Sequence, residues 1–143
     1  MRAKNILVFG IFLLMETIYS QAANNTKLTI RVQGIKNKKG TINIALFKSD
    51  TDFNQEKFTY VSRTPADSNG IIIFDKIDYG NYSVAVYHDE NENQKLDRNF
   101  IGMPKEGYGF SNNVKGKMGP PAFKDTSVIM NQAETNLSIQ LNY

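Results

Sequence analysis

The sequence predicts an all-β protein, built as a single antiparallel sandwich of two sheets with about seven strands. Three observations lead to this prediction. Apolar and polar residues alternate with a period of two through much of residues 23–143, turn-forming residues separate these runs, and no segment there has convincing helical periodicity. Residues 23–143 also have the usual length of one domain, so we expect a single domain with one shared core.

The strongest strand patterns have one apolar face. They occupy residues 27–33, 41–47, 70–77, 81–88 and 135–143, and weaker patterns lie at 58–63 and 126–130. Because side chains alternate between the two faces of a strand, the apolar set of each run faces the same side. The predicted core is Leu28, Ile30, Val32, Ile42, Ile44, Leu46, Val84, Val86, Leu137, Ile139 and Leu141.

The breaks between the strands are rich in turn-forming residues, as in NKKGT, ADSNG, DYGN and NQAET. Gly40 and Gly70 suit hairpin turns that need a positive φ, which glycine adopts without steric cost. The segment SDTDFNQEKF predicts one short helical turn, capped by Ser49 or Asp50.

The first 22 residues predict a secretory signal peptide. A positive start is followed by the apolar run ILVFGIFLLM at residues 6–15 and then by small and polar residues. The run is too short to span a bilayer, which needs roughly 20 apolar residues. Ser20 and Ala22 have the small side chains that favour a cut after Ala22, so we expect an exported protein, periplasmic or extracellular, without a transmembrane segment after cleavage.

Charge and cysteine content restrict the partners. Residues 23–143 hold 15 basic and 13 acidic residues, once Arg2, Lys4 and Glu16 are removed from the totals of 17 and 14. A formal charge of 15 − 13 = +2 favours neither nucleic acid nor an anionic membrane as the partner of the whole domain. Without cysteine, neither a disulfide nor a lipid-modified N-terminal cysteine can form.

Residues 89–123 interrupt the strand pattern. A loop of this length inside a compact domain is typically functional or disordered. Its apolar residues gain from burial, which favours an ordered excursion, with a short strand at about 107–111. These apolar residues are Phe100, Ile101, Met103, Tyr108, Phe110 and Phe123.

The excursion begins with a candidate calcium loop. Asp89, Asn91, Asn93 and Asp97 stand at positions one, three, five and nine, where the loop of an EF-hand supplies side-chain oxygens, and Lys95 stands at position seven, where the loop supplies a carbonyl. Ca²⁺ takes six to eight oxygen ligands, and residues at odd positions converge as such a loop winds around the ion.

Two departures separate this loop from an EF-hand. Gln94 occupies the position of the usual glycine, and Phe100 occupies that of the usual bidentate glutamate. The alternative interpretation is a solvated acidic turn, because Asp and Asn are favoured in turns for their own hydrogen bonds to the backbone.

The region from Gly80 to Asn113 resembles the uncharacterised secreted bacterial proteins grouped as domain of unknown function 2141. The resemblance implies a secreted or envelope β-domain without a known activity, and members often have glycine where this chain has Gln94. The Gly-x-Tyr start of the strand at Gly80 is also similar to transthyretin-like and immunoglobulin-like sandwiches of bacterial surface proteins, at the level of fold alone. The matching motifs are GNY at 80–82, YHDEN at 87–91, NQKLD at 93–97 and GMPKEGYGFSNN at 102–113.

Two classes of function remain open. The first is a noncatalytic binding domain of the cell envelope, with a ligand surface at Tyr108, Phe110, Asn112 and Asn113 and an envelope polysaccharide or protein as its partner. Aromatic rings beside amides suit such ligands, although the same rings can also form the core of the excursion.

The second class is a hydrolase or metal-dependent enzyme that uses His88 with Asp89 and Glu90 or Glu92. His88 is the single histidine, and no Gly-x-Ser-x-Gly nucleophile motif is present. We interpret His88 as a hydrogen-bonding residue at the end of its strand, and we assign no catalytic residue.

Overall fold

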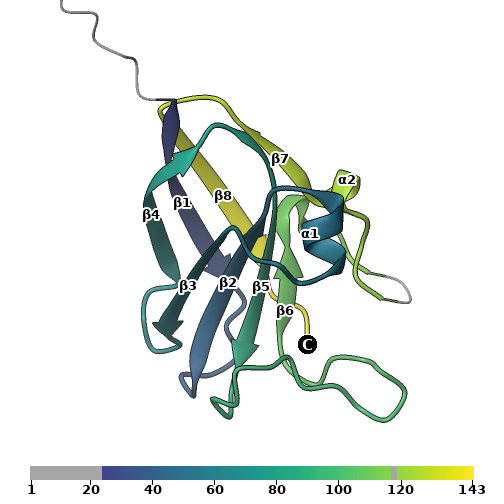
Figure 1. The fold of residues 1–143 in the computed structure, drawn as a ribbon. Helices are drawn as coiled ribbons and strands as arrows, with labels where there is room; N and C mark the ends of the chain where they lie inside the picture. The colour runs from purple at the N-terminus through teal and green to yellow at the C-terminus, as the bar shows by residue number, and fades with distance from the viewer. Residues whose placement is uncertain (1–23, 117–118) are drawn as a thin grey trace, which may run out of the picture.

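A computed structural model describes residues 24–116 and 119–143 and shows a sandwich of two sheets, as predicted (Figure 1). The smaller sheet has the strand order β4–β1–β8, with β1 at Asn25–Gln33, β4 at Ile71–Asp78 and β8 at Glu134–Gln140. The larger sheet has the order β3–β2–β5–β6, and β7 also pairs with β5. Its strands are β2 (Thr41–Phe47), β3 (Tyr60–Pro65), β5 (Gly80–Asp89), β6 (Tyr108–Phe110) and β7 (Ser127–Met130).

The central strand β5 is long enough to hold two partners on one edge. Residues 80–83 pair with β7 and residues 85–87 pair with β6, while β2 pairs along the opposite edge. The chain therefore leaves β5 at Asp89, returns as β6, and returns again as β7. This arrangement places the excursion at one end of the sandwich, beyond the arrowhead of β5 in Figure 1.

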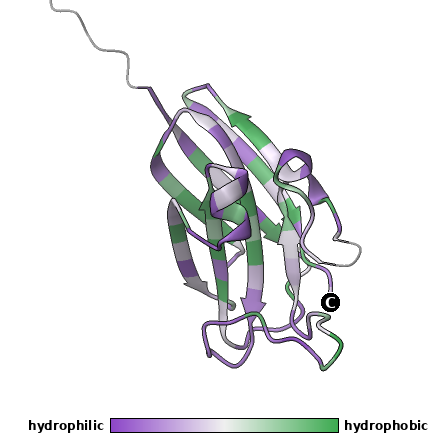
Figure 2. Cartoon of the chain, turned by 45° about the vertical axis from the view of Figure 1, so that its right-hand side comes forward, coloured by the Kyte–Doolittle hydropathy of each residue, from purple (hydrophilic) through white to green (hydrophobic). Residues whose placement is uncertain are grey.

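The core lies between the two sheets, and the predicted apolar faces form it (Figure 2). Ten of the eleven predicted core residues are buried, and Leu137 is partly buried against them. The remaining buried members of the core are Ala66, Ile72, Ile77, Tyr82 and Met130. The prediction was based on alternation alone, and it succeeds because each strand has one face turned towards the opposite sheet.

Two details of the connectivity differ from the prediction. β1 and β8 are parallel, so the sandwich is not antiparallel throughout. Gly40 and Gly70 have positive φ values of 67° and 70°, as expected, but neither closes a hairpin. Each lies between strands of different sheets, β1 to β2 and β3 to β4, because adjacent apolar runs of the chain face each other across the core.

Short helical segments lie between strands. Helix α1 (Asp50–Asn54) is the predicted helical turn, and the Ser49 side chain caps it by accepting a hydrogen bond from the N–H of Asp52. Helix α2 (Phe123–Thr126) and the 3-10 turn η1 (Ser111–Asn113) were not predicted, because one turn carries no measurable period. Phe53 of α1 is buried, with its ring against those of Phe47, Phe110 and Phe123.

The predicted signal peptide, with its cut after Ala22, lies outside the described residues. Within 24–116 and 119–143, no helix has the length and apolar content needed to cross a membrane.

Burial predicts the cost of truncating β8. Ile139 is fully buried, so Ile139→Ala should lower the free energy of unfolding by about 2–5 kcal/mol. Ile129→Ala is the matched control, because that side chain is 66% exposed on β7 and its loss should cost about 0.5 kcal/mol or less. Urea unfolding measures both values. Equal losses for the two variants would contradict the position of β8 in the core.

Candidate functional site

The excursion starts from a buried acid. Asp89 ends β5 and is fully buried, and its two carboxyl oxygens accept hydrogen bonds from the backbone N–H groups of Asn93 and Gln94, at 3.1 and 2.8 Å. A buried carboxyl group is costly unless such donors satisfy it. Asp89 therefore fixes the first turn of the loop against the end of the sandwich.

A second buried acid closes the loop from the other side. Glu106 is 5% exposed, and its carboxyl oxygens accept the backbone N–H groups of Glu90 and Asp97, at 2.9 and 3.0 Å. Sequence reasoning missed this residue, because a single glutamate before a glycine has no pattern that marks it. Glu106 joins the start of the loop, its end at Asp97, and the chain that leads into β6.

The remaining predicted ligands form a hydrogen-bonded group near the surface. The side-chain amides of Asn91 and Asn93 donate to the two carboxyl oxygens of Asp97, at 2.7 and 2.9 Å. The side-chain oxygen of Asn91 accepts the N–H of Asn93, and that of Asn93 accepts the N–H of Lys95. The structure thus brings together all five residues predicted as metal ligands, around one small loop.

Two residues of the loop have a left-handed backbone conformation. Gln94 has φ 66° and takes the left-handed conformation for which glycine is usually chosen, and Glu92 has φ 60°. In this conformation the side-chain NH₂ groups of Asn91 and Asn93, and not their oxygens, point to the carboxyl group of Asp97. Within 24–116 and 119–143, no group of three or more His, Cys, Asp or Glu side chains is placed to hold a metal ion. Oxygen coordination would require the two amide groups to turn over.

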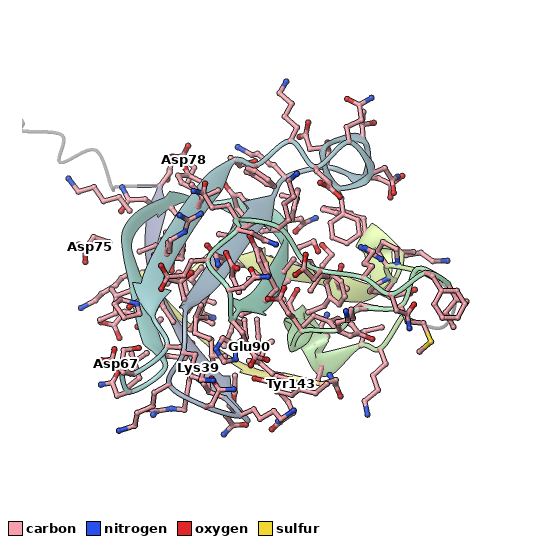
Figure 3. The ribbon with its side chains drawn as sticks, turned by 90° about the horizontal axis from the view of Figure 1, so that it is seen from below. Lys39, Asp67, Asp75, Asp78, Glu90 and Tyr143 are labelled. Carbon is pink, nitrogen blue, oxygen red and sulfur yellow. The ribbon has the colours of Figure 1, made fainter. Side chains whose placement is uncertain are left out.

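His88 has a hydrogen-bonding role at the end of β5, as predicted. The ring is fully buried, with Nε2 2.6 Å from the carbonyl oxygen of Lys39 and Nδ1 2.7 Å from the hydroxyl of Tyr143. Because a carbonyl only accepts, Nε2 carries the hydrogen and Nδ1 accepts from the tyrosine. Figure 3, seen from the excursion end, shows Lys39, Tyr143 and Glu90 near one another.

Tyr143 supports this arrangement. Burial raises the pKa of its hydroxyl above the ordinary value, although the N–H of Lys36, which donates to the oxygen at 3.0 Å, acts in the opposite direction. A neutral hydroxyl can donate to His88, so the last residue of the chain fixes the imidazole. Both ring nitrogens of His88 are then engaged within the structure.

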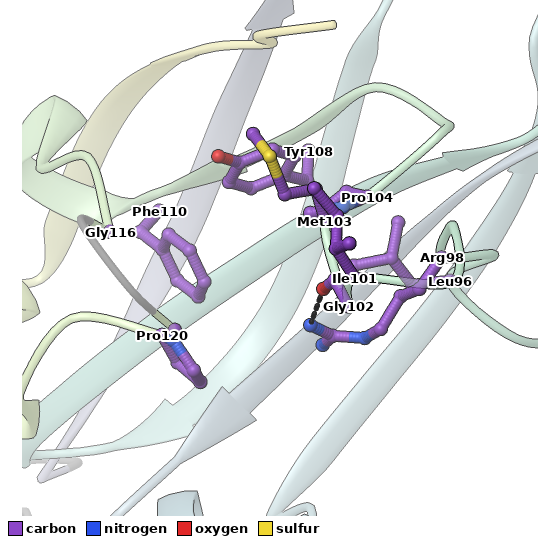
Figure 4. A pocket seen from close by; sticks show the side chains of 11 residues that line it. Leu96, Arg98, Ile101, Gly102, Met103, Pro104, Tyr108, Phe110, Gly116 and Pro120 are labelled. Carbon is purple, nitrogen blue, oxygen red and sulfur yellow. Dashed lines mark hydrogen bonds between the residues drawn. The ribbon is translucent and has the colours of Figure 1, made fainter.

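Within the excursion, a cleft of about 480 Å³ lies between residues 96–104 and β6 (Figure 4). Tyr108 and Phe110 form one wall, with ring centroids 6.1 Å apart, and Arg98 lies at the other side, where its guanidinium donates to the carbonyl of Gly102. The described lining is mainly apolar and consists of Leu96, Arg98, Ile101, Gly102, Met103, Pro104, Tyr108, Phe110, Gly116, Gly119 and Pro120.

The alternation of glycine and aromatic residues in β6 explains how the wall of the cleft forms. A Cβ atom at Gly109 would collide with the backbone oxygen of Gln140 and with Ile139, and one at Gly107 would collide with the ring of Tyr143. The glycines therefore let β6 lie against the C-terminal segment, while Tyr108 and Phe110 point to the opposite face.

Asn112 and Asn113 do not line this cleft. The amide of Asn112 donates to the carbonyls of Asp125 and Ser127. Asn113 donates to the carbonyl of Ser138 and accepts from the N–H of Gln140. Of the predicted ligand surface, the structure thus brings Tyr108 and Phe110 to the cleft, and it uses the two asparagines to fasten the chain after β6.

Comparison with known families identifies the chain. Residues 30–138 match the model of an uncharacterised protein family conserved in bacteria, DUF2141. The chain belongs to this family. The match to DUF2141 runs from β1 into β8 and so includes both sheets and the excursion, which confirms the resemblance seen in residues 80–113. Searches of the curated proteins and of the solved structures gave no match.

The hydrogen bonds to Asp97 generate a prediction about its acidity. Donation from Asn93, and then from Asn91, holds the pKa of Asp97 below its ordinary value. Asn93→Ala should therefore raise this pKa towards the ordinary value, which a carbon-detected NMR titration of the carboxyl group measures. Asn69→Ala is the control, because the Asn69 side-chain oxygen accepts the N–H of Ile71 in another turn.

The sign of the pH effect follows from the same shift. Because the folded-state pKa of Asp97 is lowered, its contribution to the stability of the loop is present above the unfolded pKa and is lost as the pH falls through the folded value. An unchanged Asp97 titration in Asn93→Ala would contradict the amide contacts.

Proposed function

We propose that this chain is a noncatalytic binding domain, exported to the cell envelope, that binds an envelope polysaccharide through the cleft between the excursion and β6. The observation that carries the proposal is the cleft itself, where two aromatic side chains face a guanidinium group across an apolar floor. Ligand sites are typically concave and apolar with a few convergent polar groups.

The chemistry of the lining suits a sugar chain. The rings of Tyr108 and Phe110 offer flat apolar surfaces for the C–H faces of sugar rings, and the Tyr108 hydroxyl and Arg98 add directional hydrogen bonds. A peptide strand would need a free sheet edge beside the cleft. The outer edge of β6 is already used, because Tyr108 exchanges two backbone hydrogen bonds with Asn142. Polysaccharide is therefore favoured over an extended protein segment.

The alternative, a hydrolase, requires an imidazole that is available to a substrate. His88 is buried and both of its ring nitrogens are engaged with Tyr143 and Lys39. The carboxyl group of Glu90 accepts from the side chain of Asn37 at 2.7 Å, and that of Asp89 accepts from the backbone of its own loop. This geometry supports a structural role for these groups and favours the binding domain.

A single substitution in the cleft tests the proposal. Tyr108→Ala should weaken binding of a glycan selected on an array by about tenfold, measured by calorimetry, because it removes one stacking surface. Tyr79→Ala is the matched control, since Tyr79 is a half-buried tyrosine between β4 and β5. Melting curves establish that both variants fold. Equal glycan affinity of Tyr108→Ala and the unaltered protein would refute the proposed site.

We also propose that calcium binds the loop that contains Asp89, Asn91, Asn93, the Lys95 carbonyl and Asp97. The convergence of these residues and the left-handed backbone of Gln94 support it. The ion would take the place of the two amide N–H groups at Asp97 and would fix the excursion from which the cleft is built. Extracellular calcium modules work with dissociation constants of roughly 10⁻⁴ to 10⁻³ M, so a site without a bidentate glutamate is strong enough to function.

Melting curves test the calcium proposal. Calcium at tenfold its dissociation constant should stabilise the fold by about 1.4 kcal/mol, and magnesium should do less because it demands a tighter octahedron. Asp97→Ala should abolish the calcium-dependent part, whereas Asp67→Ala, at an exposed turn between β3 and β4, should retain it. Asp89→Ala is less informative, because it leaves the N–H of Gln94 without an acceptor and the N–H of Asn93 with the side-chain oxygen of Asn91 alone, and it should lower stability in chelator as well. Identical curves of the unaltered protein in calcium and in chelator would refute the site.

A further inference from the structure

The far end of the excursion is a hairpin tip, residues 98–105, that exposes three large apolar side chains. Phe100 is 99% exposed, Ile101 65% and Met103 59%, so the burial expected for these three residues from the sequence does not occur. Figure 2 shows the apolar end of the excursion standing away from the core of the sandwich. Scattered apolar residues are common on a surface, but three within four positions at one apex form a contiguous patch, which marks an interaction site.

Asn99 satisfies part of the backbone of the tip. The Asn99 side-chain oxygen accepts the N–H groups of Ile101 and Met103, at 3.1 and 3.0 Å. The Asn99 N–H donates to the Met103 carbonyl, and the Gly102 N–H donates to the Asn99 carbonyl, at 2.8 and 2.9 Å. A segment that enters a lipid environment must satisfy its polar backbone internally, because no water is present to do so. Asn99 provides several of these internal hydrogen bonds, and its side chain carries no charge.

Two exposed cations flank the apolar side chains. Arg98 and Lys105 stand at the two ends of the tip, and residues 98–105 contain no acid. The adjacent acids are hydrogen-bonded within the loop, since Asp97 accepts two side-chain amides and Glu106 accepts two backbone N–H groups, although Asp97 also interacts with the charge of Lys105. The tip therefore has a local charge of +2, although the domain as a whole is nearly balanced.

We propose that this tip inserts into the boundary between headgroups and acyl chains of an anionic lipid bilayer. Phe100, Ile101 and Met103 would enter the acyl region, and Arg98 and Lys105 would contact the phosphates, as in other shallow interfacial anchors. The charge of the tip favours a lipid surface over a second copy of this chain, in which two cationic tips would repel each other. Insertion goes beyond the proposed glycan site: Phe100 and Lys105 lie outside the cleft, and Arg98, Ile101 and Met103 belong to both surfaces.

Vesicle sedimentation tests the insertion, with phosphatidylcholine vesicles that contain or lack 30% phosphatidylglycerol and with chelator present to remove calcium bridges. The unaltered protein should bind the anionic vesicles more tightly. Phe100→Ser should reduce partitioning about tenfold. Arg98→Gln with Lys105→Gln should reduce it about 25-fold on anionic vesicles alone, since each cation contributes roughly fivefold near such a surface.

Matched variants elsewhere on the surface serve as controls. Ile129→Ser changes a side chain of similar exposure on β7, and Lys76→Gln with Lys124→Gln removes the same charge from other exposed sites. Each control should partition as the unaltered protein does. The apolar run at residues 6–15, where it is retained, is identical in all variants, so differences among them report on the tip.

Fluorescence gives an independent readout because the chain contains no tryptophan. The emission of Phe100→Trp should shift to the blue on anionic vesicles and be quenched by lipids brominated in the acyl chain, whereas Phe58→Trp, at an exposed site outside the tip, should do neither. Equal partitioning of Phe100→Ser and the unaltered protein would overturn the proposal. So would a dimer in sedimentation equilibrium that Phe100→Ser dissociates, since the tip would then bind a second copy.

Discussion

Two buried carboxyl groups, those of Asp89 and Glu106, hold the excursion to the sandwich, and the cleft and the exposed tip both depend on them. Each accepts two backbone N–H groups, and together they join the end of β5, the turn that follows it, and the segment before β6. Burial of an acid is costly in isolation, and four backbone donors offset that cost. Asp89 and Glu106 together therefore hold these three segments in place.

The rest of the site follows from the strand β5 and its edge. Because β6 and β7 share that edge, the segment between them must leave the sheet and return. The side chains of Asn112 and Asn113 donate to backbone carbonyls of nearby segments of the same protein, and the Ser111 hydroxyl accepts the N–H of Val84 in the sheet. The segment that follows the aromatic wall of the cleft is thus hydrogen-bonded to the sandwich.

The loop proposed to bind calcium and the tip proposed to bind lipid place different physical demands on one excursion. The loop at 89–97 is polar, closely wound and closed by amide and carboxyl groups. The tip at 98–105 has an apolar apex, and the side chain of Asn99 accepts two of its backbone N–H groups. Leu96 of the loop and Arg98 of the tip both line the cleft, so an ion at the loop and a bilayer at the tip would both act on the same ligand site.

The sequence by itself determined the sandwich, its core and the turn positions, because strand periodicity and the steric freedom of glycine are local properties. Ile30 and Val84 are recognisable as core residues from their neighbours alone. The sequence also placed the five candidate ligands in one loop, since residues at alternate positions of a tight turn must converge. The sequence also indicated Tyr108 and Phe110 as part of a candidate ligand surface, because two aromatic residues at alternate positions of a short strand lie on the same side.

The tertiary structure alone decided which of these residues meet groups distant in sequence. In the folded structure β1 and β8 pair in parallel, and the turns at Gly40 and Gly70 connect strands of different sheets. The side chain of Asn113 is hydrogen-bonded to the backbone of β8. It also brought Glu106 to the N–H groups of the loop and Tyr143 to His88. Such contacts join residues separated by many positions, and no local periodicity encodes them, because they arise only when the two sheets close on a shared core.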